Sequence, residues 1–215
     1  MITAVDGLLR GEGRFAVGGG RVPAARLAAI LGACGFAYGL AMGAYAGRPE
    51  QSLYSGLKVP LLLAAATLVC VPSFYVLNAL LGLRDDFAAA LRGILAAQAT
   101  VAVALAALLP LVLVAYASHV DYRSAVLANG AMFAFATLAG QRTLDRHYRP
   151  LVRADRRHAL ARRLWVLLYV FVAVQLAWVL RPFIGDPHRE PSFLRDDAWS
   201  NAYVVVLRDV LGAWN

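Results

Sequence analysis

Two adjacent acids, Asp85 and Asp86, are the side chains of this sequence best suited to acid–base or metal chemistry. A catalytic or metal site would need further acids or histidines beside them, and none lies nearby in the sequence. They precede the segment Phe87–Leu91, and carboxylates at the start of a helix are favoured by its dipole. We therefore interpret them as N-cap or first-turn residues, with a catalytic or metal site as the alternative.

The other reactive side chains form no catalytic or cofactor pattern. The sequence has no Gly-x-Ser-x-Gly, Ser-x-x-Lys or Walker motif, and its histidines lack metal-ligand spacing. We interpret Cys34 and Cys70 as small core residues, and His147 and His158 as a solvated pair on a charged surface. We expect a protein that is not an enzyme, with no catalytic residue, no metal and no cofactor.

Four amide side chains lie inside the apolar parts of the sequence, namely Asn78, Gln98, Asn129 and Gln175. Their simplest role is hydrogen bonding between helices, worth about 1 kcal/mol each. The alternative is a polar path for a small solute. No Asp, Glu, Lys, Arg or His lies deep within an apolar run, which argues against a proton relay or a voltage sensor.

A dense arginine cluster at Gln141–Arg163 lies between two apolar runs, Ser124–Gly140 and Leu164–Leu180. Only Asp145 and Asp155 offset it. Such a cluster beside membrane-length apolar segments marks a cytoplasmic loop. We expect it to form a short helical hairpin that contacts anionic lipid or a partner through Arg142, Arg146, Arg149, Arg153, Arg156, Arg157, Arg162 and Arg163.

Composition also indicates a membrane protein. The chain is 60% hydrophobic and 16% charged, with a mean hydropathy of +0.61, whereas soluble domains average about 25% charged residues. A net charge of +8 is compatible with nucleic-acid binding. However, the positive residues gather in loops beside apolar runs, so anionic lipid headgroups are the expected partner and nucleic acid is not.

The apolar runs predict an all-α bundle of five transmembrane spans. Their predicted ranges are 24–46, 59–83, 93–118, 124–140 and 164–180. With a cytoplasmic N-terminus, fourteen of the 21 lysines and arginines fall on the inner side and seven on the outer side, in agreement with the positive-inside rule. We therefore expect a bacterial inner-membrane protein whose C-terminus is periplasmic.

The segments around these spans have their own expected structures. Residues 1–23 read as a cytoplasmic segment without a signal peptide, and 47–57 as a short outer loop. Pro60 would lie in a first helical turn, Pro72 would kink the second span, and Pro150 would end a helix that continues from the fourth. Residues 181–215 would form an outer cap that ends in an interfacial amphipathic helix.

Glycine recurs at every fourth position of the first span, at Gly35, Gly39, Gly43 and Gly47. Residues four apart share one helix face, so these glycines would form a groove that another helix can approach closely. The sequence leaves open whether that helix belongs to this chain or to another. A neighbour in the same chain is favoured because a bundle offers several.

Two segments carry a resemblance to known proteins. The block Leu57–Asp86 (LKVPLLLAAATLVCVPSFYVLNALLGLRDD) and the exit Trp178–Gly185 (WVLRPFIG) resemble bacterial polytopic inner-membrane proteins of unassigned function. The layout of a cytosolic N-terminus, five spans and a short outer tail is similar to that of Yip1-type membrane proteins. These likenesses imply a multi-span membrane protein and supply no catalytic residue.

Two functions of different classes follow from these features. The first is a non-enzymatic membrane scaffold or accessory subunit, which packs through its glycine face against other membrane subunits or a second copy of itself. The second is a channel or permease for a small solute, which would use the proline kinks and the amides. A lipid-modifying enzyme ranks third, since only Asp85 and Asp86 could serve as its acids.

Overall fold

The protein is an all-α bundle, as predicted. The computed structural model describes residues 24–187, 189–194 and 201–204, and these contain five long α-helices and no strand. The predicted segment 1–23 and most of the predicted C-terminal amphipathic helix lie outside the described residues. The helices are α2 (Ala24–Gly43), α3 (Pro49–Leu80), α4 (Phe87–Ala117), α5 (Tyr122–Ala154) and α6 (Arg157–Val179), with the 3₁₀ helices η2 (Ala44–Ala46) and η3 (Arg84–Asp86) between them.

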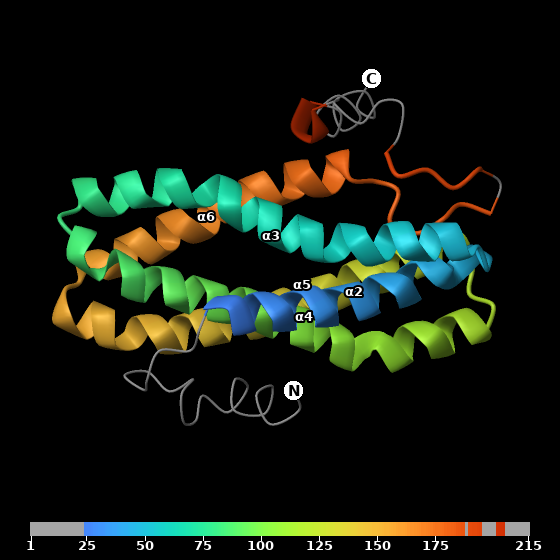
Figure 1. The fold of residues 1–215 in the computed structure, drawn as a ribbon, viewed down its shortest axis with the longest axis horizontal. Helices are drawn as coiled ribbons and strands as arrows, with labels where there is room; N and C mark the ends of the chain where they lie inside the picture. The colour runs from blue at the N-terminus through green and yellow to red at the C-terminus, as the bar shows by residue number, and fades with distance from the viewer. Residues whose placement is uncertain (1–23, 188, 195–200, 205–215) are drawn as a thin grey trace, which may run out of the picture.

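The five helices lie side by side and are joined by short connections at the two ends of the bundle (Figure 1). We call the end that holds residues 44–48 and 118–121 the outer end, and the end that holds 81–86 and 155–156 the inner end. Helix α2 packs on α3 and α4, α5 packs on α4, and α6 packs on α3. Helices α5 and α6 meet at the inner end and diverge from there (Figure 1).

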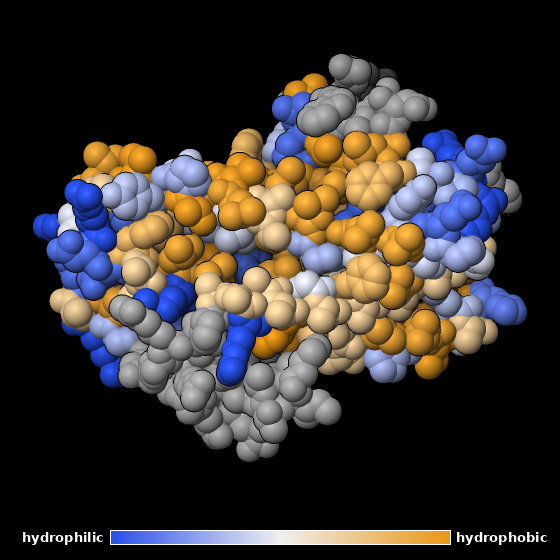
Figure 2. Space-filling model, viewed as in Figure 1, coloured by the Kyte–Doolittle hydropathy of each residue, from blue (hydrophilic) through white to orange (hydrophobic). Residues whose placement is uncertain are grey.

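Four helices are long and apolar enough to cross a membrane, namely α2 with η2, α3, α4 with η3, and α6. Among the described residues α5 is not one of them, because its apolar run is short, contains Asn129, and continues into the arginine cluster. Figure 2 shows hydrophilic residues at both ends of the bundle and mostly hydrophobic residues between them on the visible face. This banded surface fits a multi-span membrane protein.

Two predicted helix boundaries are wrong, and each involves a proline. Residues 49–57 are not an outer loop, since α3 begins at Pro49 with a proline in its first turn. Pro60 therefore lies inside α3. Pro150 does not end its helix either, because α5 continues to Ala154 and ends at Asp155. Prolines are tolerated inside long membrane helices when neighbouring groups satisfy the backbone.

Glycines allow α2 and α3 to approach each other closely. A β-carbon at Gly39 would lie 2.8 Å from the Cα of Gly56, and one at Gly43 would lie 2.7 Å from the Cα of Ser52. Both distances are well below the usual carbon–carbon contact of about 3.5–4.0 Å. Gly35 faces Pro60 at 3.4 Å. The glycine face is thus covered by a helix of the same chain.

Gly47 does not belong to that face. It follows η2 with a φ of +67°, and a β-carbon there would meet nothing within 4 Å. Glycine is favoured at this position because few other residues adopt a positive φ. Its spacing of four from Gly43 therefore reflects a turn rather than helix packing.

Candidate functional sites at the two ends of the bundle

An extended segment crosses the outer end after α6 ends. We call residues 181–187 and 189–194 the outer strap. Three buried polar side chains on one face of α3 point their donors at its backbone, and their spacing of four and three residues places them on successive turns: Gln51, Ser55 and Lys58. Together they fasten the strap to α3.

Lys58 is the central contact of this fastening. It is fully buried, and its Nζ donates to the carbonyl oxygens of Pro182 at 2.6 Å and Ser192 at 3.4 Å. The ammonium also lies 5.2 Å from the ring centre of Phe193. Carbonyl oxygens and an aromatic face replace the water that a buried cation loses. Lys58 is therefore stabilised only while the strap covers it.

Gln51 and Ser55 reinforce the same contact. The amide nitrogen of Gln51 lies 3.2 Å from the Pro182 carbonyl oxygen and 3.3 Å from that of Phe183. The Ser55 hydroxyl also donates to the Phe183 carbonyl. At the far side of the strap, Arg48 donates to the Pro187 carbonyl at 3.0 Å.

Sequence reasoning missed this fastening because it assigned Gln51 and Ser55 to a loop. The available signal was the single lysine in a chain whose other 20 basic residues are arginines.

A cavity of about 950 Å³ lies beneath the strap. This volume is within the range of about 300–1,000 Å³ that is typical of small-molecule sites. The walls come from α3, α5 and the end of α6, and the roof comes from the strap. Its apolar lining includes Met42, Leu62, Val126, Phe133 and Ala177, and its polar lining includes Arg48, Gln51, Asn129, Arg181, Asp186, Arg189 and Glu190.

Of the four amides that the sequence suggested for a polar path, Asn129 alone lines this cavity. Its side chain accepts a hydrogen bond from the Tyr38 hydroxyl at 2.9 Å and donates to the Tyr116 hydroxyl at 3.0 Å. The Tyr116 hydroxyl in turn donates to the Met42 carbonyl. Asn129 thus joins α5 to α4 and α2 through hydrogen bonds between helices, the simpler of the two roles expected for it. The sequence did not indicate which residues it would contact.

The other three amides lie apart from one another and bond elsewhere. Asn78 donates to the Phe74 carbonyl one turn earlier in α3. Gln98 accepts from the Tyr169 hydroxyl at 3.1 Å, which joins α4 to α6. Gln175 accepts from the backbone nitrogen of Ala202 at 3.0 Å. In this conformation, none of these three lines the cavity that Asn129 does.

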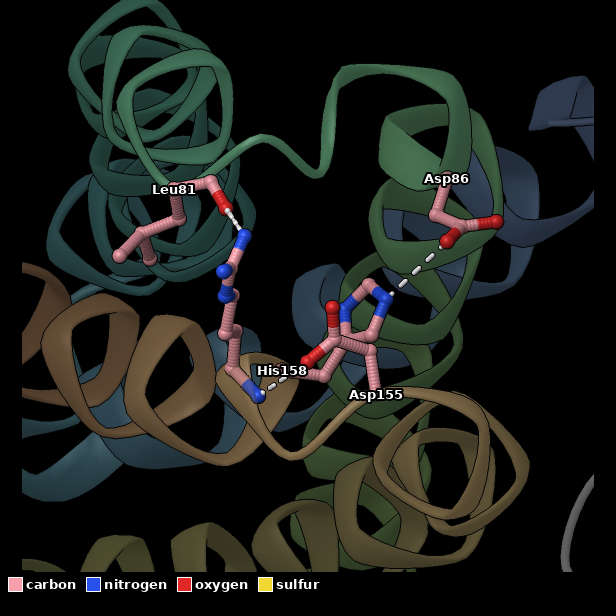
Figure 3. Close-up of polar contacts among 5 residues, drawn as sticks. Leu81, Asp86, Asp155 and His158 are labelled. Carbon is pink, nitrogen blue, oxygen red and sulfur yellow. Dashed lines mark hydrogen bonds and ion pairs between the residues drawn. The ribbon is translucent and has the colours of Figure 1, made fainter.

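The inner end is held by a histidine–aspartate pair (Figure 3). The Nε2 of His158 lies 3.1 Å from Oδ2 of Asp86, and His158 is fully buried while the Asp86 side chain is half exposed. His158 is therefore not a solvated residue of the charged surface, as the sequence had indicated. Asp86 does occupy the N-cap position of α4, but its carboxylate makes no capping bond there.

Arg157 adds a second contact at the same place. Its guanidinium donates to the Leu81 carbonyl at 3.3 Å, and its backbone nitrogen donates to the Asp155 carboxylate at 2.8 Å (Figure 3). The turn between α5 and α6 is thus docked on the connection between α3 and α4. Within the described residues, no three His, Cys, Asp or Glu side chains are grouped in a way that could hold a metal.

The arginine cluster surrounds this inner end. Arg162 is half-buried and pairs with Asp145 across the hairpin. The remaining seven are exposed: Arg142, Arg146, Arg149, Arg153, Arg156, Arg157 and Arg163. They lie on the last turns of α5, on the first turns of α6 and in the turn between them. The predicted basic hairpin is therefore not a separate element, because it is formed by the inner ends of these two long helices.

The two adjacent acids should behave differently on substitution. Replacing Asp86 by Ala should lower the stability by about 0.5–1.5 kcal/mol, because it leaves the buried His158 without its hydrogen-bond partner. Asp85→Ala is the matched control, since Asp85 is exposed, and it should leave stability unchanged. The reaction of the buried Cys70 with a thiol dye during heating would measure both. Equal effects of the two substitutions would argue against the His158 contact.

Comparisons of the chain with protein-family models, with curated proteins and with solved structures find no match in any of the three. The sites at both ends are therefore interpreted from their own chemistry.

Proposed function

We propose that this chain is a bacterial inner-membrane protein that crosses the bilayer five times. Four crossings would be the long apolar helices α2, α3, α4 and α6. Helix α5 would be the fifth, because it follows α4 and precedes α6 through short connections and must return the chain to the inner end.

The arginine cluster supports an orientation with the inner end in the cytoplasm. The N-terminus would then be cytoplasmic and the outer strap periplasmic. If the N-terminus stays in the cytoplasm, a four-crossing arrangement, with α5 outside the membrane, would place the arginine cluster in the periplasm and the strap in the cytoplasm. The two arrangements therefore predict opposite accessibility at the same residues.

Single cysteines at the two ends would decide between them. Arg153 and Leu194 are both exposed, at the inner end and on the strap. In intact cells, a membrane-impermeant maleimide should label Leu194→Cys and should label Arg153→Cys only after permeabilisation. The unmodified protein is the control, since Cys34 and Cys70 are buried. The reverse pattern would contradict five crossings with a cytoplasmic N-terminus.

Within this topology, we propose that the protein acts as a non-enzymatic scaffold or accessory subunit. The observation that carries the proposal is the set of exposed arginines on a docked inner end. Contacts from His158 and Arg157 fix the hairpin on the α3–α4 connection, so the positive charges form a rigid platform. Such a platform favours binding to anionic headgroups or to an acidic partner surface.

The glycine face is not available for a partner, because α3 covers it. Other subunits, or a second copy, would instead pack on apolar faces that the bundle leaves exposed. Such faces include Leu127, Phe135 and Leu138 on α5.

A pull-down of tagged protein in gentle detergent, followed by native mass measurement, tests this function. A stoichiometric partner or bound anionic lipid is expected, and it should be lost from the Arg149→Gln/Arg153→Gln variant. Arg123→Gln, at the outer end, should retain it. A bare monomer that the substitutions leave unchanged would argue against the scaffold.

A channel or permease is the second candidate, and the cavity is the observation that favours it. It reaches from the outer end to Asn129, as the outward half of a solute path would. A complete path would need a second conformation, since Asn78 and Gln98 bond elsewhere. Flux of small neutral or anionic solutes into liposomes would support this candidate over the scaffold.

A further inference from the structure

The cavity beneath the outer strap combines two kinds of lining. Toward the middle of the bundle its walls are apolar, with Leu62 from α3, Phe133 from α5 and Ala177 from α6. Toward the strap they are charged, with Arg48, Arg181 and Arg189. An amphiphile with an ionic head and a hydrocarbon tail matches this division, because each part would meet groups of its own polarity.

The position of the cavity also suits an amphiphile from the membrane. Its lining comes in part from the outer half of α5 and the last turn of α6. These two helices diverge from the inner turn (Figure 1). Val126 and Gly130, which line it on α5, are exposed. In the five-crossing topology this side of α5 faces the outer leaflet. A lipid chain could therefore enter from the side while its headgroup stays at the level of the strap.

The charged lining contains anions as well as cations. Asp186 lies 3.8 Å from Arg189 in a weak ion pair. Glu190 makes no ion pair with any residue that the structure describes. Gln51 is almost fully buried, lines the cavity, and its Oε1 has no hydrogen-bond partner among the described residues. Buried acceptors of this kind are rare and call for a donor.

We propose that this cavity binds one phospholipid whose headgroup carries both a phosphate and a primary ammonium. The phosphate would lie against the arginines, which bind phosphate oxygens through paired N–H groups. The ammonium would lie against the Glu190 carboxylate, and a turn of the enclosed Gln51 side chain toward the cavity would add its Oε1 as a second acceptor. One acyl chain would follow the apolar wall between α5 and α6. The outer-leaflet assignment rests on the five-crossing topology, whereas the binding chemistry does not.

The matched glycines Gly130 and Gly32 allow a direct test of occupancy. A β-carbon at either position would meet nothing within 4 Å, but only Gly130 lines the cavity. Purified protein would be refilled with phosphatidylethanolamine and analysed by native mass spectrometry. Gly130→Leu should reduce the bound lipid about tenfold relative to the wild type, and Gly32→Leu should not. Equal retention in both variants would overturn the proposal.

Headgroup selectivity tests the role of the carboxylate. The wild type should retain phosphatidylethanolamine over phosphatidylglycerol of the same acyl chains, and Glu190→Gln should abolish that preference without abolishing binding. No preference in the wild type would overturn the zwitterionic assignment. Soluble glycerophosphoethanolamine should fail to displace the lipid, and efficient displacement would show that the ligand is a free phosphoester instead.

These results can be separated from a failure of the topology. If the wild type bound no phosphatidylethanolamine while Leu194→Cys was labelled by maleimide in intact cells, the lipid site alone would be overturned. Retained binding together with labelling of Arg153→Cys in intact cells would overturn the outer-leaflet assignment and five crossings with a cytoplasmic N-terminus, and would leave the headgroup chemistry in place.

Discussion

Replacing Gly39 by Leu is expected to lower the thermal unfolding midpoint by about 6–12 °C, which corresponds to about 3 kcal/mol in a chain of this size. The reason is the contact of α2 with α3, where a β-carbon at Gly39 would lie 2.8 Å from the Cα of Gly56 and would also meet the Ser55 carbonyl. Backbone atoms cannot rotate away as a side chain can. The two helices would have to separate.

Separation would also affect the outer end. Ser55 lies beside Gly39 and, together with Gln51, donates to the strap. A shift of α3 away from α2 would therefore disturb helix packing and strap contacts together. This coupling makes Gly39, like Gly43, a position on α2 where substitution should be costly.

The matched control for Gly39 is Gly32, which lies on the same helix with open space around it. Gly32→Leu should leave the midpoint unchanged or raise it slightly, since glycine inside a helix costs up to about 1 kcal/mol. The buried thiols of Cys34 and Cys70 report unfolding in detergent through a thiol-reactive dye. If Gly39→Leu changed only the oligomeric state and left the midpoint unaltered, the glycine face would belong to an interface between chains.

Much of the fold follows from local sequence patterns. The apolar runs predicted the four long apolar helices, because the hydropathy of a segment depends only on its own residues. The spacing of Gly35, Gly39 and Gly43 predicted a smooth face, since residues four apart coincide on a helix. The face that covers it could not be predicted, because any neighbouring helix would satisfy the same pattern.

Helix boundaries at prolines were less predictable. Pro49 and Pro60 are both compatible with the first turn of a helix. Which of them begins α3 depends on the tertiary surroundings of the residues between them. In the fold, Gln51 and Ser55 are buried under the strap, which favours helix from Pro49 onward. That burial depends on residues more than 120 positions away.

The polar contacts at the two ends lay beyond sequence reasoning for the same reason. His158 and Asp86 are 72 positions apart, and Lys58 and Pro182 are 124 apart. A search for partners near Asp86 in the sequence finds none, although the fold supplies one. The composition did hold one usable signal, since a lone lysine among arginines indicates a site that a guanidinium does not fit.

Replacing Lys58 by Met should loosen the outer strap without unfolding the bundle. Met fills a similar volume with an unbranched chain, so the packing of α3 would persist. The Ser192 carbonyl would lose its donor, and the Pro182 carbonyl would keep only Gln51. A buried carbonyl that loses its hydrogen-bond donor costs about 1–3 kcal/mol. The equilibrium constant for opening of the strap should therefore rise by about tenfold or more. The midpoint should change less, because removal of a buried charge offsets part of the loss.

Tryptic cleavage after Arg189, an exposed residue of the strap, measures this opening. The cleavage rate should rise about tenfold in Lys58→Met, in line with the opening equilibrium. Leu57→Met is the matched control, because Leu57 is half exposed and neighbours Lys58 in the sequence. Its cleavage should match that of the wild type, and equal rates in the two variants would contradict the fastening.

The wild-type lysine gives an independent measurement of the same contact. As the only lysine of the chain, Lys58 is a unique side-chain target for an amine reagent. It should resist modification in the folded protein, because it is fully buried, and react on denaturation. Gln51→Leu keeps the lysine but removes two donors to the strap, so Lys58 should become reactive in the folded state. Protection that persists in this variant would show that Ser55 and Lys58 hold the strap without Gln51, whereas exposure would show that Gln51 is needed to keep the outer end closed.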